Sequence, residues 1–172
     1  MKDELRKRYL NIRKNITNRD ILDNNIYKKI INHEKINSCE TILIYVSYNY
    51  EVDTLKIIKY FLNKKKVAVP KICENEMKFY YINSFNDLSI GKYGILEPTT
   101  KEEVNDFNNA ICITPGICFN KDGYRIGYGK GYYDRFFDKH NLYKIGLCYK
   151  ECLITNKFNS NFDKKVDEII TE

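Results

Sequence analysis

The sequence predicts a single-domain α/β protein: a three-layer fold of the open, doubly wound type with a mainly parallel sheet. Apolar runs of strand length alternate along the chain with amphipathic helical segments, which is typical of strands joined by helical crossovers. A length of 172 residues suits one domain with a hydrophobic core and is short for two. No repeat, linker or low-complexity block divides the chain, so residues 1–172 are expected to form one domain.

Two helices are expected before the first strand. Apolar residues recur at helical spacing over residues 2–15, and again from Ile21 to Ile30. Asn18 is a candidate N-cap for the second of these helices, because asparagine side chains accept hydrogen bonds from free helix amides.

The remaining elements follow in alternation. Residues 41–48, TILIYVSY, form a nearly continuous apolar run that indicates a buried strand. Thr54 opens an amphipathic helix over 54–65, and residues 66–70 read as a short strand that Pro70 ends. Further strands are expected at 77–82, 109–114, 143–149 and 167–171, with a helix over 132–140.

Composition limits the possible partners. The net charge is +6, but lysine and arginine are interleaved with acidic residues along the whole chain. Such a balance suits either nucleic acid or an anionic small substrate. No apolar run approaches the roughly 20 residues of a membrane span, and the charged start, MKDELRKRYL, lacks the apolar middle of a signal peptide.

The six cysteines show no Cys-x-x-Cys pair and no zinc spacing. Most lie inside apolar runs, so reduced, buried thiols and a cytoplasmic location are expected. The two histidines, His33 and His140, have no partner at metal spacing and are expected to be surface or core residues without a catalytic role.

One stretch is unusual: GYRIGYGKGYYDRFF, residues 123–137, holds four of the eight glycines. It follows the 109–114 strand and leads into the 132–140 helix, where helix N-termini bind anions in α/β folds. Glycines there leave backbone amides open to a phosphate chain, Arg125 and Lys130 would neutralise it, and Asp134 could hold a metal. The alternative is a glycine-rich turn with solvent-facing charges.

Two standard phosphate motifs are excluded. The Walker pattern fails because Gly131 stands where Ser or Thr is required after Gly129-Lys130. The dinucleotide fingerprint fails because Tyr132 occupies the position of its third glycine. The stretch is therefore a phosphate-loop candidate of another kind.

The segment TPGICFNKDGYRIGYGKGYYDRFF, residues 114–137, resembles the signature of the 5-formyltetrahydrofolate cyclo-ligase (methenyltetrahydrofolate synthetase) family. The opening KDELRKR, YNYEVDT (48–54), YGILEP (93–98) and the tail FDKKVDEIIT (162–171) resemble further family segments in the same order. The resemblance covers nearly the whole chain. It departs from the family pattern at Asn120, often Asp, and Ile126, often Leu, and neither side chain carries chemistry in this interpretation.

The resemblance implies an ATP-dependent enzyme. ATP would phosphorylate the formyl oxygen of 5-formyltetrahydrofolate, the neighbouring nitrogen would close the ring, and phosphate would leave as 5,10-methenyltetrahydrofolate forms. Lys130 and Arg125 are the implied catalytic residues. The implied ATP-binding residues are Lys2, Arg6, Arg125, Ile126, Gly127, Tyr128, Gly129, Lys130, Gly131, Tyr132 and Tyr133.

The resemblance also implies a folate site and a metal site. The implied folate-binding residues are Val46, Glu51, Tyr128, Gly129, Lys130, Gly131 and Tyr132. Glu51 would accept hydrogen bonds from the pterin, and tyrosines suit a flat ring by stacking. Asp134 and Asp163 are the implied Mg²⁺ ligands, in keeping with that ion's preference for carboxylate oxygens. Each of these three acids, taken alone, could instead be a surface, loop or helix-turn acid.

Two other functions remain open at this point. A nucleic-acid-binding module would use the basic residues and the 15 tyrosines as stacking platforms. A sugar-phosphate or CoA-ester enzyme of similar architecture would not need Lys2, Arg6 or the pair of aspartates. The family interpretation predicts small-molecule partners, ATP and 5-formyltetrahydrofolate, with no nucleic acid, no membrane and a monomeric chain.

Overall fold

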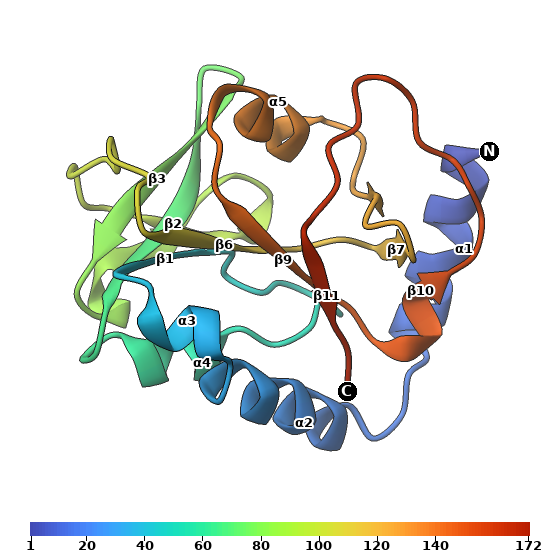
Figure 1. Cartoon of the computed structure of the whole chain (residues 1–172), viewed down its shortest axis with the longest axis horizontal. Coiled ribbons are helices and arrows are strands. Elements are labelled where there is room, and N and C mark those ends of the chain that lie inside the picture. Colours follow the sequence, from blue (N-terminus) through green and yellow to red (C-terminus); the bar gives the residue numbers. More distant parts are fainter.

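The computed structural model describes all 172 residues and centres on a six-stranded sheet with strand order β11-β9-β6-β1-β2-β3 (Figure 1). Neighbouring strands are parallel except for β2 and β3, so the predicted mainly parallel sheet is confirmed. The strands are β1 (Thr41–Ile44), β2 (Lys66–Cys73), β3 (Glu76–Ile82), β6 (Ala110–Thr114), β9 (Tyr143–Leu147) and β11 (Glu168–Ile170).

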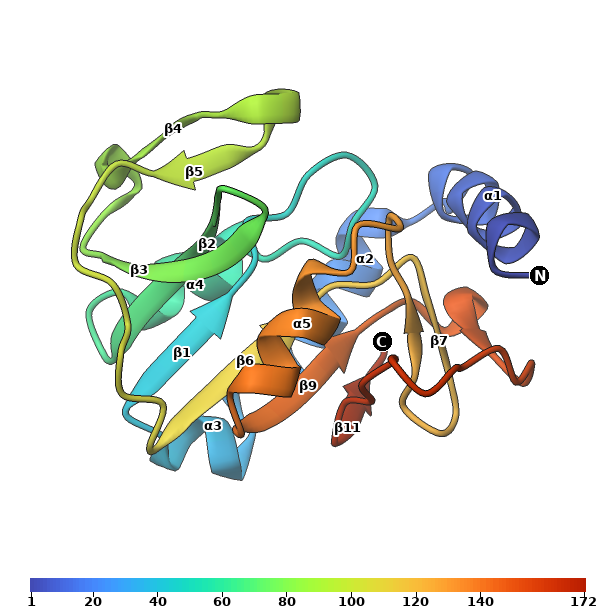
Figure 2. The same cartoon turned by 90° about the horizontal axis from the view of Figure 1, so that it is seen from above.

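Helices cover both faces of this sheet, which gives the three predicted layers (Figures 1 and 2). Along β1 successive side chains alternate between the faces: Ile42 and Ile44 pack with the helices of one face, Leu43 with the helix of the other. The first face carries α2 (Arg19–Ile31), α3 (Glu34–Ser38) and α4 (Leu55–Phe61), and the second carries α5 (Tyr132–Lys139).

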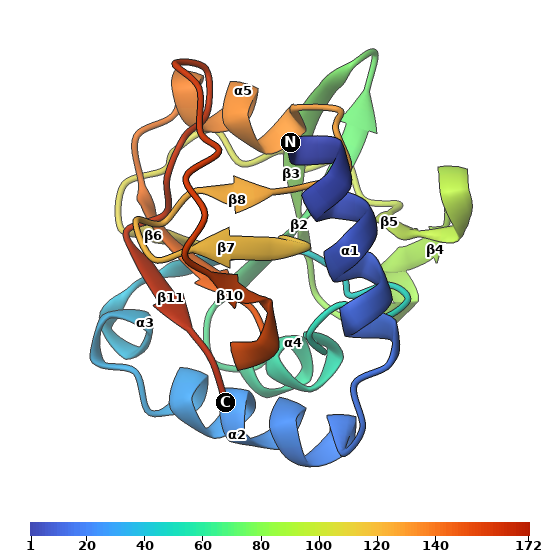
Figure 3. The same cartoon turned by 90° about the vertical axis from the view of Figure 1, so that its right-hand side faces the viewer.

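A second, three-stranded sheet of order β10-β7-β8 lies beside α1 (Lys2–Lys14) (Figure 3). Leu5 and Tyr9 of α1 pack against Phe119 and Ile126 of this sheet in a separate apolar cluster. This sheet was not predicted, because strands of two or three residues are too short to show a period of two. Its strands are β7 (Cys118–Asn120), β8 (Arg125–Ile126) and β10 (Leu153–Ile154).

Two short connections complete the chain. A hairpin follows β3, and a single helical turn precedes β10. The hairpin consists of β4 (Leu88–Ile90) and β5 (Leu96–Pro98). The short 3₁₀ helices are η1 (Phe85–Asp87), η2 (Lys92–Gly94) and η3 (Lys150–Cys152).

The predicted strand over 41–48 is wrong beyond Ile44. Thr54 accounts for the early end: its hydroxyl donates to the Tyr45 carbonyl at 2.7 Å and accepts from the Ser47 amide at 2.9 Å. A side chain thus satisfies backbone groups that would otherwise need a neighbouring strand. Tyr45 and Val46 stay buried without being part of the sheet.

Pro70 does not end its strand, contrary to the prediction. β2 continues to Cys73 and pairs with β3 throughout, whereas its pairing with β1 stops at Ala68. Pro70 therefore lies where β2 has a neighbour on one side only, and a missing amide proton is tolerated there. The helix after Asn18 is confirmed, but Asn18 is left-handed (φ 58°) and its side chain makes no capping bond.

All six cysteines are free thiols, five of them buried and Cys73 partly so, as predicted. His33 bonds to Glu168 and accepts from the Ile36 amide, while His140 stacks on Phe107 and Phe136, so both histidines have structural partners. No helix combines the length and the apolar character needed to cross a membrane.

Candidate active site

The glycine loop, defined here as Gly127–Gly131, connects β8 to the start of α5. Gly129 (φ +96°) and Gly131 (φ +71°) adopt backbone conformations that other residues rarely take. At position 127 a glycine is favoured for a different reason, because a Cβ there would lie 2.8 Å from Nη1 of Arg125. The glycines thus both shape the turn and make room for the half-buried Arg125.

The backbone amides of this segment are available to a ligand. From Gly127 to Asp134 no amide N–H donates to another protein group, and the first bond of α5 runs from the Arg135 amide to the Gly131 carbonyl. Tyr128, Gly129 and Lys130 are exposed. Free amides at a helix N-terminus, with the positive end of the helix dipole behind them, form an anion-binding site.

The start of α1 lies against the glycine loop. Nε of Arg6 donates to the Gly127 carbonyl at 2.7 Å, and the Arg6 guanidinium also pairs with Asp3. One turn earlier, Nζ of Lys2 lies 2.6 Å from Oδ2 of Asp163. Lys2 and Arg6, which the sequence places on one helix face, are therefore both brought to the predicted site.

Asp134 and Asp163 also come together. Oδ1 of Asp134 accepts from the amide of Lys164, the residue after Asp163, at 3.1 Å. Burial raises the pKa of Asp163, but hydrogen bonds from Lys2 and from the Ser160 amide outweigh it and leave this pKa below its ordinary value. No group of three or more potential metal-ligating side chains occurs in the structure. Two carboxylates beside a phosphate site still suit Mg²⁺, which takes its other oxygens from phosphates and water.

Arg125 is packed against the inner side of the glycine loop. Its guanidinium lies 4.9 Å from the Tyr133 ring centre and bonds weakly to the Pro115 carbonyl at 3.4 Å, and its buried Nε has no partner. Burial lowers the pKa of Arg125, and the charge of Asp134 acts against that effect. Arg125 is therefore a half-buried cation next to Gly127, with its Nε withdrawn from solvent.

Lys130 has the opposite character. It is exposed, its Nζ bonds to no protein group, and only its carbonyl is engaged, by Nη1 of Arg135 at 2.8 Å. Of the other loop neighbours, Ile126 is buried in the α1 cluster and offers only its backbone, while the Tyr132 ring packs against Arg135.

Glu51 lies in the loop between β1 and α4. Oε1 accepts from the Tyr48 amide at 2.8 Å, and burial raises the Glu51 pKa to about 7, with the Tyr48 hydrogen bond and the Arg13 charge acting against burial. Burial and then the charge of Glu51 raise the pKa of Tyr128, so the two loops are neighbours (Figure 2). Val46, predicted with Glu51, is buried at 4% exposure and offers little surface to a ligand.

Sequence reasoning missed Arg13. This residue is buried on α1, and its Nη2 donates to the Tyr128 hydroxyl at 2.7 Å. A signal was available: Lys2, Arg6 and Arg13 are spaced by four and seven residues and so share one face of a helix.

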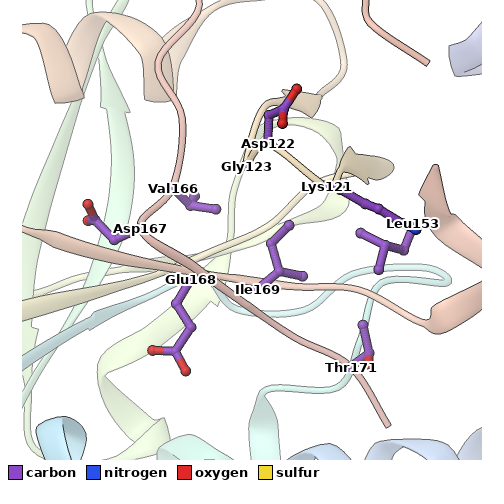
Figure 4. A pocket seen from close by; sticks show the side chains of 9 residues that line it. All are labelled: Lys121, Asp122, Gly123, Leu153, Val166, Asp167, Glu168, Ile169 and Thr171. Atoms are coloured by element: carbon purple, nitrogen blue, oxygen red, sulfur yellow. The ribbon is translucent and has the colours of Figure 1, made fainter. Parts of the chain in front are cut away.

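The predicted residues line neither of two pockets found elsewhere on the protein. A pocket of about 350 Å³ is formed near Gly123, Leu153 and Glu168 (Figure 4), and one of about 540 Å³ near Lys65 and Tyr81. Neither contains any of the predicted site residues. The candidate site is thus identified by its charges and free amides.

Comparisons with known proteins identify the family of this chain. The model of the 5-formyltetrahydrofolate cyclo-ligase family matches residues 1–172. A probable 5-formyltetrahydrofolate cyclo-ligase from Caenorhabditis elegans is 29% identical over 164 residues, covering 86% of this chain and 80% of the relative. The structure resembles the 5,10-methenyltetrahydrofolate synthetase of Aquifex aeolicus with a TM-score of 0.89 and 30% identity, over 98% of this chain and 88% of that one. The synthetase of Mycoplasma pneumoniae gives 0.79 and 25%, over 99% and 98%. This chain belongs to the 5-formyltetrahydrofolate cyclo-ligase family.

Proposed function

We propose that this protein converts 5-formyltetrahydrofolate to 5,10-methenyltetrahydrofolate with ATP as co-substrate, releasing ADP and phosphate. The observation that carries the proposal is the glycine loop at the start of α5, with its free amides and Lys130, next to Lys2 and Arg6 of α1. This arrangement occurs in a chain that matches the family over its whole length.

The chemistry needs positioning more than covalent work. The formyl oxygen attacks the γ-phosphorus and ADP leaves; the neighbouring nitrogen then attacks the formyl carbon, loses its proton, and phosphate departs. The glycine-loop amides and Lys130 would bind the transferring phosphoryl group, and electrostatic donors that are fixed in advance stabilise its charge. Glu51 would orient the pterin, and the aromatic faces of Tyr128 and Tyr132 would pack on it.

A magnesium ion fits the same site. Asp134 and Asp163 would hold it beside the phosphates, where it would neutralise charge on the triphosphate. The reduced thiols support a cytoplasmic location, and a site assembled from α1, the glycine loop and the β1–α4 loop of one chain supports a monomer.

The direct experiment mixes the purified protein with 5-formyltetrahydrofolate, ATP and magnesium and measures product formation. Methenyl product, detected by its absorbance, should appear only when all three are present, with ADP and phosphate in equal amounts. Turnover without ATP, or no turnover with all three, would contradict the proposed function.

The magnesium site has its own test. Asp134→Asn and Asp163→Asn keep the side-chain size but remove the charge that attracts the metal, so each should raise the magnesium concentration giving half-maximal rate, Asp134→Asn more strongly. Rates are titrated against magnesium at saturating ATP. Asp122→Asn, at an exposed acid in the β7–β8 turn, is the control and should behave like the parent. Parent-like dependence in both site variants would show that the nucleotide alone holds the metal.

A further inference from the structure

Arg13 is a buried cation that the proposed chemistry does not yet use. It is 3% exposed, and its acceptors are two oxygens without a full charge: the Tyr128 hydroxyl at 2.7 Å and the Gly116 carbonyl at 3.4 Å. Its Nε has no partner. A buried positive charge without an anion is costly, so a compensating negative charge nearby is expected.

Glu51 supplies that charge. The Arg13 charge lowers the Glu51 pKa against the effect of burial. The other titratable groups that face Glu51 are tyrosines: Tyr45 after β1, Tyr128 in the glycine loop and Tyr133 of α5. Their pKa values are raised above 10, first of all by burial, so they are neutral at pH 7 and Arg13 is the positive charge among these neighbours.

The position of Arg13 is fixed from α2. Arg19 donates to the Arg13 carbonyl and, through Nη1, to the Tyr50 carbonyl at 2.8 Å, next to Glu51. Asp23 accepts from the Asp53 amide at 3.3 Å in the same loop. The end of α1 and the Glu51 loop are therefore held together, and Arg13 extends from this junction to the glycine loop.

We propose that Arg13 is a positioning residue of this active site: its buried guanidinium holds the Tyr128 hydroxyl of the glycine loop and balances the charge of the Glu51 carboxylate in the folate site. The inference rests on the proposed function. It deepens it by linking the folate-binding acid to the phosphate loop through one side chain.

The test is the pH profile of kcat/KM for 5-formyltetrahydrofolate, because this profile reports the ionisation of the free enzyme. The rate is measured as folate-dependent ADP release. Removing a neighbouring charge shifts a pKa by about one unit or more. Arg13→Met should therefore lose about tenfold more activity relative to the parent at pH 6 than at pH 8.5. Tyr128→Phe should lower kcat/KM by a factor that is equal at pH 6 and pH 8.5. In a Glu51→Gln background the Arg13→Met loss should become independent of pH.

Two further variants keep the inference falsifiable. Lys14→Met removes an exposed charge from the same helix turn and should match the parent at every pH. Arg13→Lys keeps the charge but lacks the forked guanidinium donor. It should retain the parent's pH profile while its kcat/KM falls by as much as that of Tyr128→Phe. This variant still tests the inference if Arg13→Met does not fold. An Arg13→Met loss that is constant with pH, or an Arg13→Lys profile displaced from the parent's, would overturn the inference. A parent without folate-dependent ADP release would instead refute the proposed function.

Discussion

Replacing Lys130 with alanine is expected to lower turnover by about 100-fold or more, the usual effect of deleting one fixed donor from a charge-stabilising site. The Lys130 ammonium bonds to no protein group, so its donors are free for a phosphoryl group. The fold should be unchanged, because an exposed side chain without partners contributes little to stability. Steady-state kinetics at saturating ATP and folate, with thermal denaturation alongside, measure both effects.

Lys121→Ala is the matched control for Lys130. Lys121 is an exposed lysine in the β7–β8 turn, outside the glycine loop, and its removal changes the net charge equally. If the turnover rates of Lys130→Ala and Lys121→Ala both lie within about threefold of the parent's rate, Lys130 is a solvated loop residue. Its catalytic assignment is then wrong.

Glu51→Gln is expected to lower kcat/KM for 5-formyltetrahydrofolate about 10- to 100-fold at pH 8, since hydrogen bonds to a charged group contribute about 1.5–3 kcal/mol. The KM for ATP should change little, because Glu51 lies in the β1–α4 loop. The parent's activity should fall as the pH drops through about 7, where Glu51 takes up a proton, and the variant should lack this limb.

Glu51→Gln is also expected to change the stability of the folded protein, in a direction that follows from the raised pKa of Glu51. The folded-state pKa of Glu51 is raised above its ordinary value, so the folded protein binds this proton more tightly than the unfolded chain. The stability that this carboxyl contributes is fully present below pH 4.5 and is lost as the pH rises through about 7. Glu51→Gln should therefore gain stability relative to the parent between pH 5 and pH 8 in urea denaturation. Glu74→Gln, at an exposed turn acid, should show no such gain. An equal pH dependence in Glu51→Gln and the parent would refute the raised pKa.

The fold was predictable where local pattern and burial coincide. The strand Ala110–Thr114 is central in the sheet and buried on both faces, so it appears in the sequence as a continuous apolar run. The sheet of β7, β8 and β10 could not be recognised, because its strands have only two or three residues and β10 joins it from a distant part of the chain. Pro70 was misjudged because the sequence does not show on which side a strand is paired.

Residue type and spacing indicated Lys130 and Asp134, whereas Lys2, Arg6 and Asp163 came from the family resemblance. The structure brings these residues to the neighbourhood of the glycine loop, and their roles stay predictions.

The site was not predictable where the surroundings determine the role. Arg13 looks like a solvated charge in sequence, yet it is buried and bonds to Tyr128 of the glycine loop. Arg125 was predicted to face a phosphate, but its half-buried position on the inner side of the loop does not show in the sequence. The raised pKa of Glu51 likewise arises from burial by residues far away along the chain.

The ion pair between Lys2 and Asp163 joins residues to which the proposal gives different partners, the nucleotide and the metal. The Lys2 ammonium and the Asp163 carboxylate neutralise each other at 2.6 Å. A phosphate that draws Lys2 away leaves Asp163 uncompensated, and a cation at Asp163 releases Lys2. Each ligand therefore prepares the site for the other, so their binding free energies are coupled, and by linkage the coupling is reciprocal. An exchange of this kind favours the magnesium complex of the nucleotide over either component alone.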